Sequence, residues 1–434
     1  MQATRSRTDG TPLSRDYRET PFWWDRTPPA AVPASGLPSE ADAVVVGGGY
    51  TGLGAASELA GLGRSVVVLE KHHLGFGAST RNGGMIHPGT KLELDELFRR
   101  PIGRELYDFT VEAFESAESM IEREGIECDY RRSGHLYLAS RRSHVESLRA
   151  IERLYTERLG QRARFVPRER IDEEIGSHAY HGAVVIEKSG GLDPARYHAA
   201  ILRQATRAGA SLHERTPALG LKRRSTGGGF EVATPFGRIR ARDVIVATNG
   251  YRDGLVPWLR RRIVPVGSYI IATEPMDAST ATEVNPNGRM FFDSKNFLNY
   301  WRLSSDGRML FGGRASMAPT TIAKARDTLY RQMIAAHPQL EGLQVARAWG
   351  GKVGFSFDRL PHAGRRDGLY FALGYCGTGV ALASYLGSCI GAWAAGGSAP
   401  PFARMRFPVV PGGGSAERLL PIAGLYYQLR DRLG

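Results

Sequence analysis

Short apolar runs alternate with helical periodicity along most of this chain. DAVVV, which starts at Asp42, is a run of the kind found in buried parallel strands. GGGYTG follows it, then the small-residue stretch LGAASELAGLG with helical character, then a second apolar run, SVVVLE, which ends at Glu70. Strand, glycine-rich turn, helix and strand fit within about thirty residues. The pattern therefore predicts one βαβ unit.

The rest of the chain shows the same two patterns, helical spacing of apolar residues and short strand-like runs. Helical spacing predicts helices over 92–123, 143–159, 195–210 and 321–336. Alternating or apolar runs predict strands at GHLYLA, SLHERT, FEVATP, RDVIVAT, several stretches within 263–313, and DGLYFALG. The run of three glycines at 227–229 predicts a hairpin turn between two of them.

This order predicts an α/β protein of two domains, since 434 residues are too many for one simple core. A Rossmann-like dinucleotide-binding domain is expected from the separated segments 39–90, 180–255 and 346–398. An inserted antiparallel-sheet substrate domain is expected from 91–179 and 256–345. Residues 1–38 are predicted to form an extended, proline-rich arm pinned by Trp23 and Trp24, and 399–434 a linker and a C-terminal amphipathic helix.

Charge and cysteine content narrow the function classes. The formal net charge is +13, but arginines are scattered rather than gathered on one face, so no nucleic-acid partner is expected. A positive field that draws in an anionic substrate remains an alternative. Three cysteines without metal-ligand spacing predict neither a disulfide framework nor a metal site, and suit the cytoplasm. The apolar stretch 380–395 is short for a bilayer and is predicted to be a buried helix.

The turn after the first strand carries the spacing Gly47-x-Gly49-x-x-Gly52. Such glycines allow a tight turn, close approach of the backbone to a pyrophosphate, and close helix packing. Unpaired N–H groups at the helix N-terminus then favour phosphate. The carboxylate of Glu70 stands where ribose hydroxyls would be bound. The sequence predicts a dinucleotide site, which we assign to Gly47, Gly49, Tyr50, Thr51, Gly52, Glu70 and Lys71.

The segment after the second strand, GFGASTRNGG, resembles the D-amino-acid oxidase-like FAD oxidoreductases, the group that includes glycine oxidase and sarcosine oxidase. The resemblance is greatest to the γ-glutamylputrescine oxidoreductase branch. It implies FAD as the cofactor, with contacts from Ser79, Arg81, Asn82, Gly83 and Gly84. A cation at Arg81 would suit phosphate, and the two glycines would let the backbone pack against a flat ring.

Six further segments extend the resemblance. ATNG from Ala247 resembles the strand end where the FAD domain returns, and GYCGTG resembles the last FAD loop, which implies Gly374, Gly377, Thr378 and Gly379 as contacts. LNYWR with LFGGR resembles substrate-domain strands, and WGG with DRLP resembles a turn over the flavin. No cysteine lies between Trp349 and Pro361, the region of covalent attachment in sarcosine-type members, so FAD should be non-covalent.

The implied chemistry is oxidation of a C–N bond to an imine, which water hydrolyses to a carbonyl compound, in a small amine or amino acid. Tyr300, Arg302 and Tyr269 are the expected pocket residues, an arginine–tyrosine pair being suited to a substrate carboxylate. Sheet packing for Tyr300 and a surface position for Arg302 are the alternatives.

The family's flavin-facing lysine, used in oxygen activation, has no counterpart at 308–314, and Lys352 is a candidate substitute. Oxygen is the expected electron acceptor, and a quinone or carrier protein the alternative. A hypothesis from another functional class is a basic flavoprotein that binds a membrane or a nucleic acid and whose FAD is structural. The C-terminal amphipathic helix could dock on the fold, on a partner or at a membrane surface.

Overall fold

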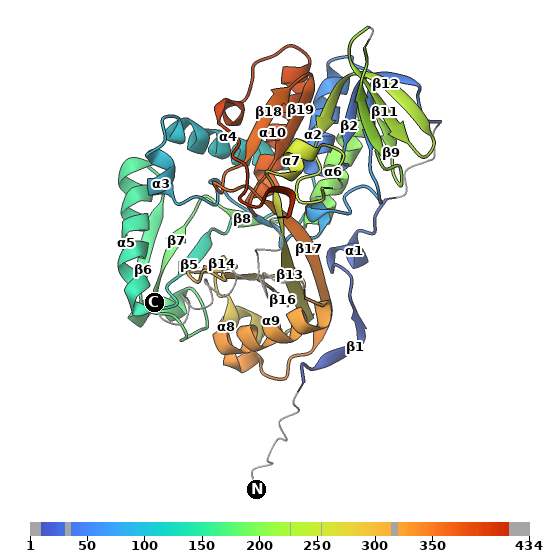
Figure 1. The fold of residues 1–434 in the computed structure, drawn as a ribbon. Helices are drawn as coiled ribbons and strands as arrows, with labels where there is room; N and C mark the ends of the chain where they lie inside the picture. The colour runs from blue at the N-terminus through green and yellow to red at the C-terminus, as the bar shows by residue number, and fades with distance from the viewer. Residues whose placement is uncertain (1–9, 31–35, 226, 253, 314–319, 416–434) are drawn as a thin grey trace.

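Two large β-sheets and the helices that cover them make up the fold (Figure 1). The structure is a computed structural model, and it describes residues 10–30, 36–225, 227–252, 254–313 and 320–415. The C-terminal amphipathic helix expected within 399–434 falls mostly at 416–434, outside the described residues. Within the described residues, no helix combines the length and apolar character needed to cross a bilayer.

The dinucleotide-type sheet has the predicted βαβ unit at its centre. β2 (Glu40–Val46) pairs in parallel with β3 (Val66–Leu69), and α2 (Tyr50–Gly61) connects them. The four residues of β3 are all buried, as the apolar run predicted. The other strands of this eight-stranded sheet are β9 (Ser211–His213), β10 (Gly220–Arg223), β11 (Phe230–Thr234), β12 (Gly237–Val246), β18 (His362–Arg366) and β19 (Leu369–Leu373).

Helices cover one face of that sheet, and a core of small, aliphatic and aromatic side chains fills the space between them. α10 (Gly379–Ala394) packs along α2, and its apolar side is buried, as predicted for 380–395. Glycines make this approach possible: a Cβ on Gly54 would lie 2.4 Å from the Ser384 carbonyl oxygen. α6 (Pro194–Arg207) and α4 (Gly103–Arg123) complete the layer, with short α3 (Leu94–Phe98) preceding α4.

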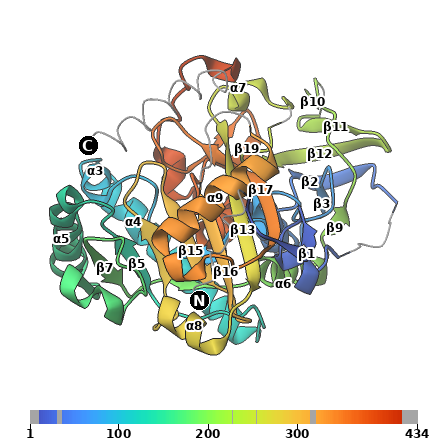
Figure 2. The same cartoon turned by 90° about the horizontal axis from the view of Figure 1, so that it is seen from below.

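The second sheet has nine strands in the order β1-β17-β13-β16-β15-β14-β5-β7-β6. Helix α9 (Ile322–Ala336) crosses one face, as Figure 2 shows from below, and shares an apolar core with it. Its strands are β1 (Leu13–Arg18), β5 (His135–Leu138), β6 (Ala163–Pro167), β7 (Gly182–Ile186), β13 (Val264–Pro275), β14 (Met290–Asp293), β15 (Asn299–Leu303), β16 (Arg308–Gly313) and β17 (Val345–Phe355). The remaining elements are α1 (Trp23–Arg26), α5 (Val145–Arg153), α7 (Pro257–Arg260), α8 (Ala278–Val284), β4 (Met85–Ile86) and β8 (Gly190–Gly191).

Sheet membership differs from the predicted domain segments in two places. β7 and β17 fall in the segments 180–255 and 346–398, which were expected in the dinucleotide domain, yet both strands pair within the nine-stranded sheet. WGG at Trp349 was expected as a turn, but it lies in the middle of β17. The glycines serve packing here: a Cβ on Gly350 would lie 2.8 Å from the Tyr269 ring.

The N-terminal arm is more structured than the predicted extended lead-in. β1 pairs in parallel with β17, and α1 forms a single helical turn. Trp23 is 1% exposed and its Nε1 donates to the Asn82 carbonyl at 2.9 Å, while Trp24 Nε1 donates to Thr80 Oγ1 at 2.9 Å. The arm is therefore fixed to the loop that follows β3, as the tryptophan pair predicted.

Candidate functional site

A cavity of about 1670 Å³ lies between the two sheets. Its walls come from the glycine turn after β2, the loop after β3, the start of α10, and the strands β5, β13, β14 and β15. Ligand pockets are commonly about 300–1,000 Å³. The cavity is therefore large enough for a dinucleotide together with a second molecule.

The glycine turn closes tightly beneath this cavity. A Cβ on Gly52 would lie 1.8 Å from the Gly47 carbonyl oxygen, and Gly47 has a φ of +112°. A Cβ on Gly49 would lie 2.8 Å from Ser79 Oγ, which also accepts the Tyr50 N–H at 3.0 Å. Glycine at these positions thus brings the turn, helix α2 and the following loop into contact.

Two helix N-termini meet at this part of the cavity. α2 begins after Gly49 and α10 after Thr378, and neither start carries a side-chain cap. Thr51 Oγ1 and the Tyr375 hydroxyl are 2.7 Å apart and join the two starts. Uncapped first turns present N–H groups and the positive end of the helix dipole. Negative charge on a ligand would be stabilised here.

The loop 78–84 is held in shape by its own polar groups. Asn82 Nδ2 donates to the Ala78 and Ser79 carbonyls, and its Oδ1 accepts the Gly84 N–H at 2.7 Å. The Arg81 guanidinium lies over the Trp24 and Phe76 rings, at 4.6 and 4.5 Å from their centroids. Its Nε donates to the Phe76 carbonyl at 2.7 Å, and burial lowers its pKa.

Arg81 was expected to offer its charge to phosphate. In the structure it lines the cavity, but it also ties the loop to β17, since its Nη1 donates to the Gly350 carbonyl at 3.1 Å. A second hydrogen bond links the loop to β17, because Trp349 Nε1 donates to the Arg81 carbonyl at 2.8 Å. At least two of its five N–H groups are thus used within the protein.

Almost all of the predicted cofactor residues surround one cavity. Glu70 directly follows β3, and its Oε2 accepts the Gly48 N–H at 2.9 Å and its Oε1 the His72 N–H at 3.0 Å. Gly52, Gly84 and Gly374 do not line the cavity, but they shape its walls. Those that line it are Gly47, Gly49, Tyr50, Thr51, Glu70, Lys71, Ser79, Arg81, Asn82, Gly83, Ala247, Gly377, Thr378 and Gly379.

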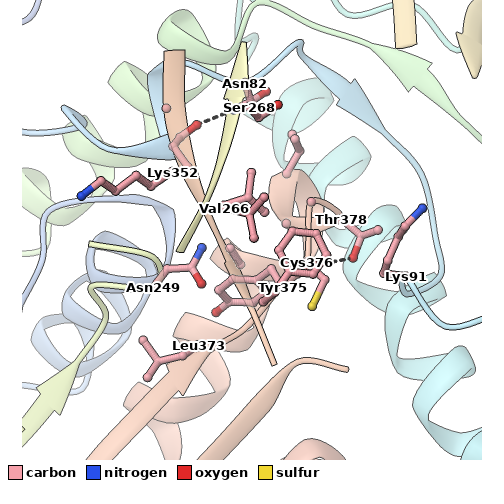
Figure 3. A pocket seen from close by; sticks show the side chains of 18 of the residues that line it. Asn82, Lys91, Asn249, Val266, Ser268, Lys352, Leu373, Tyr375, Cys376 and Thr378 are labelled. Carbon is pink, nitrogen blue, oxygen red and sulfur yellow. Dashed lines mark hydrogen bonds between the residues drawn. The ribbon is translucent and has the colours of Figure 1, made fainter. Parts of the chain in front are cut away.

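The predicted catalytic residues Tyr300 and Tyr269 lie on opposite faces of the nine-stranded sheet. Tyr300 lines the cavity, its ring lies against Gly83 and Gly312, and its hydroxyl is 3.1 Å from Ser268 Oγ. Figure 3 shows Ser268 and Asn82 on one side of the pocket, with Tyr375 and Thr378 opposite. Tyr269 also lines the cavity, but it alternates with Ser268 along β13 and so faces the other way, where its hydroxyl donates to the Thr320 carbonyl at 3.4 Å.

Lys352 lies at the cavity edge. It pairs with Gly267 in the β13–β17 register, on the face opposite Ser268, and it is exposed. In Figure 3 its amino group points away from Tyr375 and Thr378.

Arg302 corrects both sequence-based alternatives. It is neither in the cavity nor at the surface: it is 5% exposed and does not line the cavity. Its Nη2 donates to the Leu192 carbonyl at 2.8 Å, its guanidinium lies 5.3 Å from the Trp23 ring centroid, and burial lowers its pKa to about 10. The expected arginine–tyrosine pair for a substrate carboxylate does not form, because Gly84 and Leu192 lie at the Arg302 guanidinium.

Several cavity residues were not identified from the sequence. His135 and Tyr137 project from β5 and Phe292 from β14, and their alternation within short strands was the available signal. Asn249 Oδ1 accepts the Gly374 N–H at 3.0 Å, and this asparagine stood in the quoted ATNG segment. Cys376 also lines the cavity, with its thiol donating to the Gly374 carbonyl at 3.2 Å.

The residues present fit a flavin dinucleotide, because the cradle needs glycine where a Cβ would collide and it faces two helix N-termini. Comparison with known proteins agrees with this. The family model of the FAD-dependent oxidoreductases called DAO matches residues 42–393. The probable oxidoreductase OrdL of Haemophilus influenzae is 32% identical over 405 residues, which cover 90% of this chain and 92% of that protein.

Two other relatives define the range of similarity. The γ-glutamylputrescine oxidoreductase of Escherichia coli is 29% identical over 401 residues, covering 91% of this chain and 93% of its own length. The crystal structure of glycine oxidase from Geobacillus kaustophilus has a TM-score of 0.72 at 21% identity, covering 85% of this chain and 99% of that chain, so it shows a shared fold. The chain therefore belongs to the DAO family of FAD-dependent oxidoreductases.

Proposed function

We propose that this enzyme oxidises the C–N bond of a small amine or amino acid to an imine, which water hydrolyses to a carbonyl compound. The substrate loses two electrons and two protons, and oxygen takes them up to form peroxide. The observation that carries the proposal is one continuous cavity, which joins the dinucleotide cradle to a chamber walled by Tyr300, Phe292 and Tyr137. The similarity to γ-glutamylputrescine oxidoreductase supports an amine as substrate.

In this proposal the chain holds FAD by its pyrophosphate at the start of α2, around Gly49 to Gly52, with Glu70 and Lys71 at the ribose. The loop 78–84 and the start of α10 at Gly377 to Gly379 border the ring. When bound, FAD supplies the two-electron acceptor for the substrate. We propose that FAD is non-covalent, in agreement with the direction of the Cys376 thiol toward a carbonyl.

Substrate contacts are assigned to the face of the nine-stranded sheet that carries Tyr300. Its ring is held between Gly83 and Gly312, so its hydroxyl has a fixed position beside Ser268. We propose that Tyr300 positions the substrate. Tyr269 and Lys352, on the opposite face of β13 and β17, are assigned lesser roles at the cavity edge.

The experiment is anaerobic mixing of the FAD-loaded chain with sarcosine, glycine, D-amino acids, putrescine and γ-glutamylputrescine. The proposal expects at least one amine to bleach the flavin, and it fails if none does. Admitting air separates the acceptors: rapid return of the colour with peroxide supports oxygen. Slow return supports the alternative, a dehydrogenase that uses a quinone or a carrier protein.

A further inference from the structure

The chamber beyond the dinucleotide cradle has one sheet face as its wall. Phe292 of β14 pairs with Tyr300 of β15 on one side and with Tyr137 of β5 on the other. Paired residues lie on the same face, and side chains alternate with a period of two along a strand. His135, two residues before Tyr137, therefore shares the face that carries Tyr300, and all four residues line the cavity.

His87, just after β4, also lines the cavity and packs against this wall. Its ring centroid is 5.7 Å from that of His135 and 5.8 Å from that of Phe292. The His135 and Phe292 centroids are 5.4 Å apart. The two imidazoles thus form one cluster with the Phe292 ring. His87 is four residues after Gly83, which contacts Tyr300.

Their hydrogen bonds fix the tautomer of each ring. His87 Nδ1 is 2.8 Å from the Pro88 carbonyl oxygen, which can only accept, so Nδ1 carries the proton. His135 Nδ1 is 2.9 Å from Ser189 Oγ, whose own hydrogen is donated to the Ile186 carbonyl at 3.3 Å. Ser189 therefore accepts from His135 Nδ1. Each ring presents its other nitrogen, Nε2, as a lone-pair acceptor.

Both histidines line the cavity. Among the described residues, neither His87 Nε2 nor His135 Nε2 has a hydrogen-bond partner. Neither atom is among the fully buried side-chain atoms that lack one. Burial lowers the pKa of His87, and it lowers that of His135 to about 3, so both rings are neutral near pH 7. Repulsion from Lys91 also lowers the pKa of His87, and repulsion from His87 and Arg289 also lowers that of His135. Arg289 is itself paired with Glu174 and Glu187, and Glu93 and Asp293 line the same cavity.

Two lone-pair acceptors on one cavity wall suit an uncharged group with two N–H bonds. We propose that His87 Nε2 and His135 Nε2 bind the amine nitrogen of the substrate, each accepting one N–H of a neutral primary amine. This inference rests on the proposed function. The amine lone pair stays unengaged by these bonds. The uncharged amine is the form that can be oxidised.

The same arrangement selects between amines. An N-methylated amine has one N–H and leaves one Nε2 atom without a donor. A site built to hydrogen-bond an N–H rejects analogues that lack it, because the unpaired buried group remains desolvated. Primary amines should therefore be preferred over their secondary counterparts.

The test compares γ-glutamylputrescine with its analogue methylated on the reacting nitrogen, using anaerobic flavin bleaching by the FAD-loaded full chain. We expect the primary amine to bind about tenfold more tightly or better. His87→Phe and His135→Phe should remove this preference through the dissociation constant rather than the limiting rate. His87→Gln keeps an acceptor and should retain most of it, and exposed His178→Gln is the control. Equal binding of the two amines by the wild type, or a preference that survives both phenylalanine variants, overturns the proposal.

A second probe separates this inference from the proposed function. tert-Butylamine has no hydrogen on its amine-bearing carbon and so binds without being oxidised. Its titration, followed by the change in the flavin spectrum, should be weakened by N-methylation of the probe and by His87→Phe. If no amine bleaches the flavin but this binding pattern holds, the proposed function fails and the amine site stands. If the pattern is absent, the amine site fails whatever the bleaching shows.

Discussion

Gly83 lies against the Tyr300 ring so closely that a Cβ built on Gly83 would be 3.0 Å from ring atom Cε2. Gly312, on the neighbouring strand β16, bounds the same ring, and a Cβ there would be 2.4 Å from it. The two glycines come from separate parts of the molecule, the loop after β3 and the nine-stranded sheet. Together they fix the Tyr300 hydroxyl at the junction between the cofactor cradle and the substrate chamber.

Gly83→Ala should displace the Tyr300 ring and lower kcat/KM for the amine by about tenfold or more, because small displacements of a positioning group are costly. Gly61→Ala is the matched control, since a Cβ at Gly61 meets nothing within 4 Å. Steady-state kinetics on both variants provide the measurement. Unchanged kinetics in Gly83→Ala would show that the ring does not position the substrate.

Gly52→Ala should abolish FAD binding, since its Cβ would lie 1.8 Å from the Gly47 carbonyl oxygen and force the turn away from α2. The readout is the flavin content of the purified protein, with Gly61→Ala again as the control. A normal flavin content in Gly52→Ala would contradict the placement of the cofactor at this turn.

Trp23→Phe should destabilise the protein by about 1–3 kcal/mol, because the part-buried Asn82 carbonyl loses its indole N–H donor at 2.9 Å. The bound flavin should dissociate more readily, since Asn82 shapes the 78–84 loop. Urea unfolding and flavin release measure the two effects. Trp258→Phe, in a different apolar cluster, controls for the loss of an indole, and equal flavin release in both variants would argue against a role for the arm.

His198 makes stability depend on pH. Its Nε2 donates to the Gly48 carbonyl at 2.9 Å, and burial lowers its pKa from 6.5 to about 4. Between about pH 4 and pH 6.5 the unfolded chain therefore binds more protons at His198 than the folded chain does. The contribution of neutral His198 to stability is fully present above about pH 6.5 and is lost as the pH falls toward 4. The difference corresponds to roughly 3 kcal/mol at full protonation. His198→Gln should flatten the dependence of the unfolding free energy on pH in this window, and an unchanged slope would contradict the assignment.

The dinucleotide half was predictable because its signals are local. A four-residue buried strand, the glycines at 47, 49 and 52 and the acidic end of β3 lie within one βαβ unit, and each acts on its near neighbours. Sheet membership of β7 and β17 could not be read in this way. Those strands are apolar or glycine-rich whichever sheet they join, and long-range pairing decides between the sheets.

The substrate side was less predictable for the same reason. Arg302 and Tyr300 share a strand and a face, so the sequence favoured an arginine–tyrosine pair, but the Leu192 carbonyl takes the guanidinium at 2.8 Å. His135 and Phe292 meet at the chamber only because β5 pairs with β14, two strands that are far apart in the sequence. Residues that meet in this way have no common local motif.

The most direct test of amine oxidation is an anaerobic titration of the FAD-loaded protein with γ-glutamylputrescine, in which bleached flavin and the carbonyl product are both counted. The account predicts one carbonyl compound for each flavin bleached. Flavin that stays oxidised with this and every other amine of the panel, or that bleaches without a carbonyl product, would contradict it.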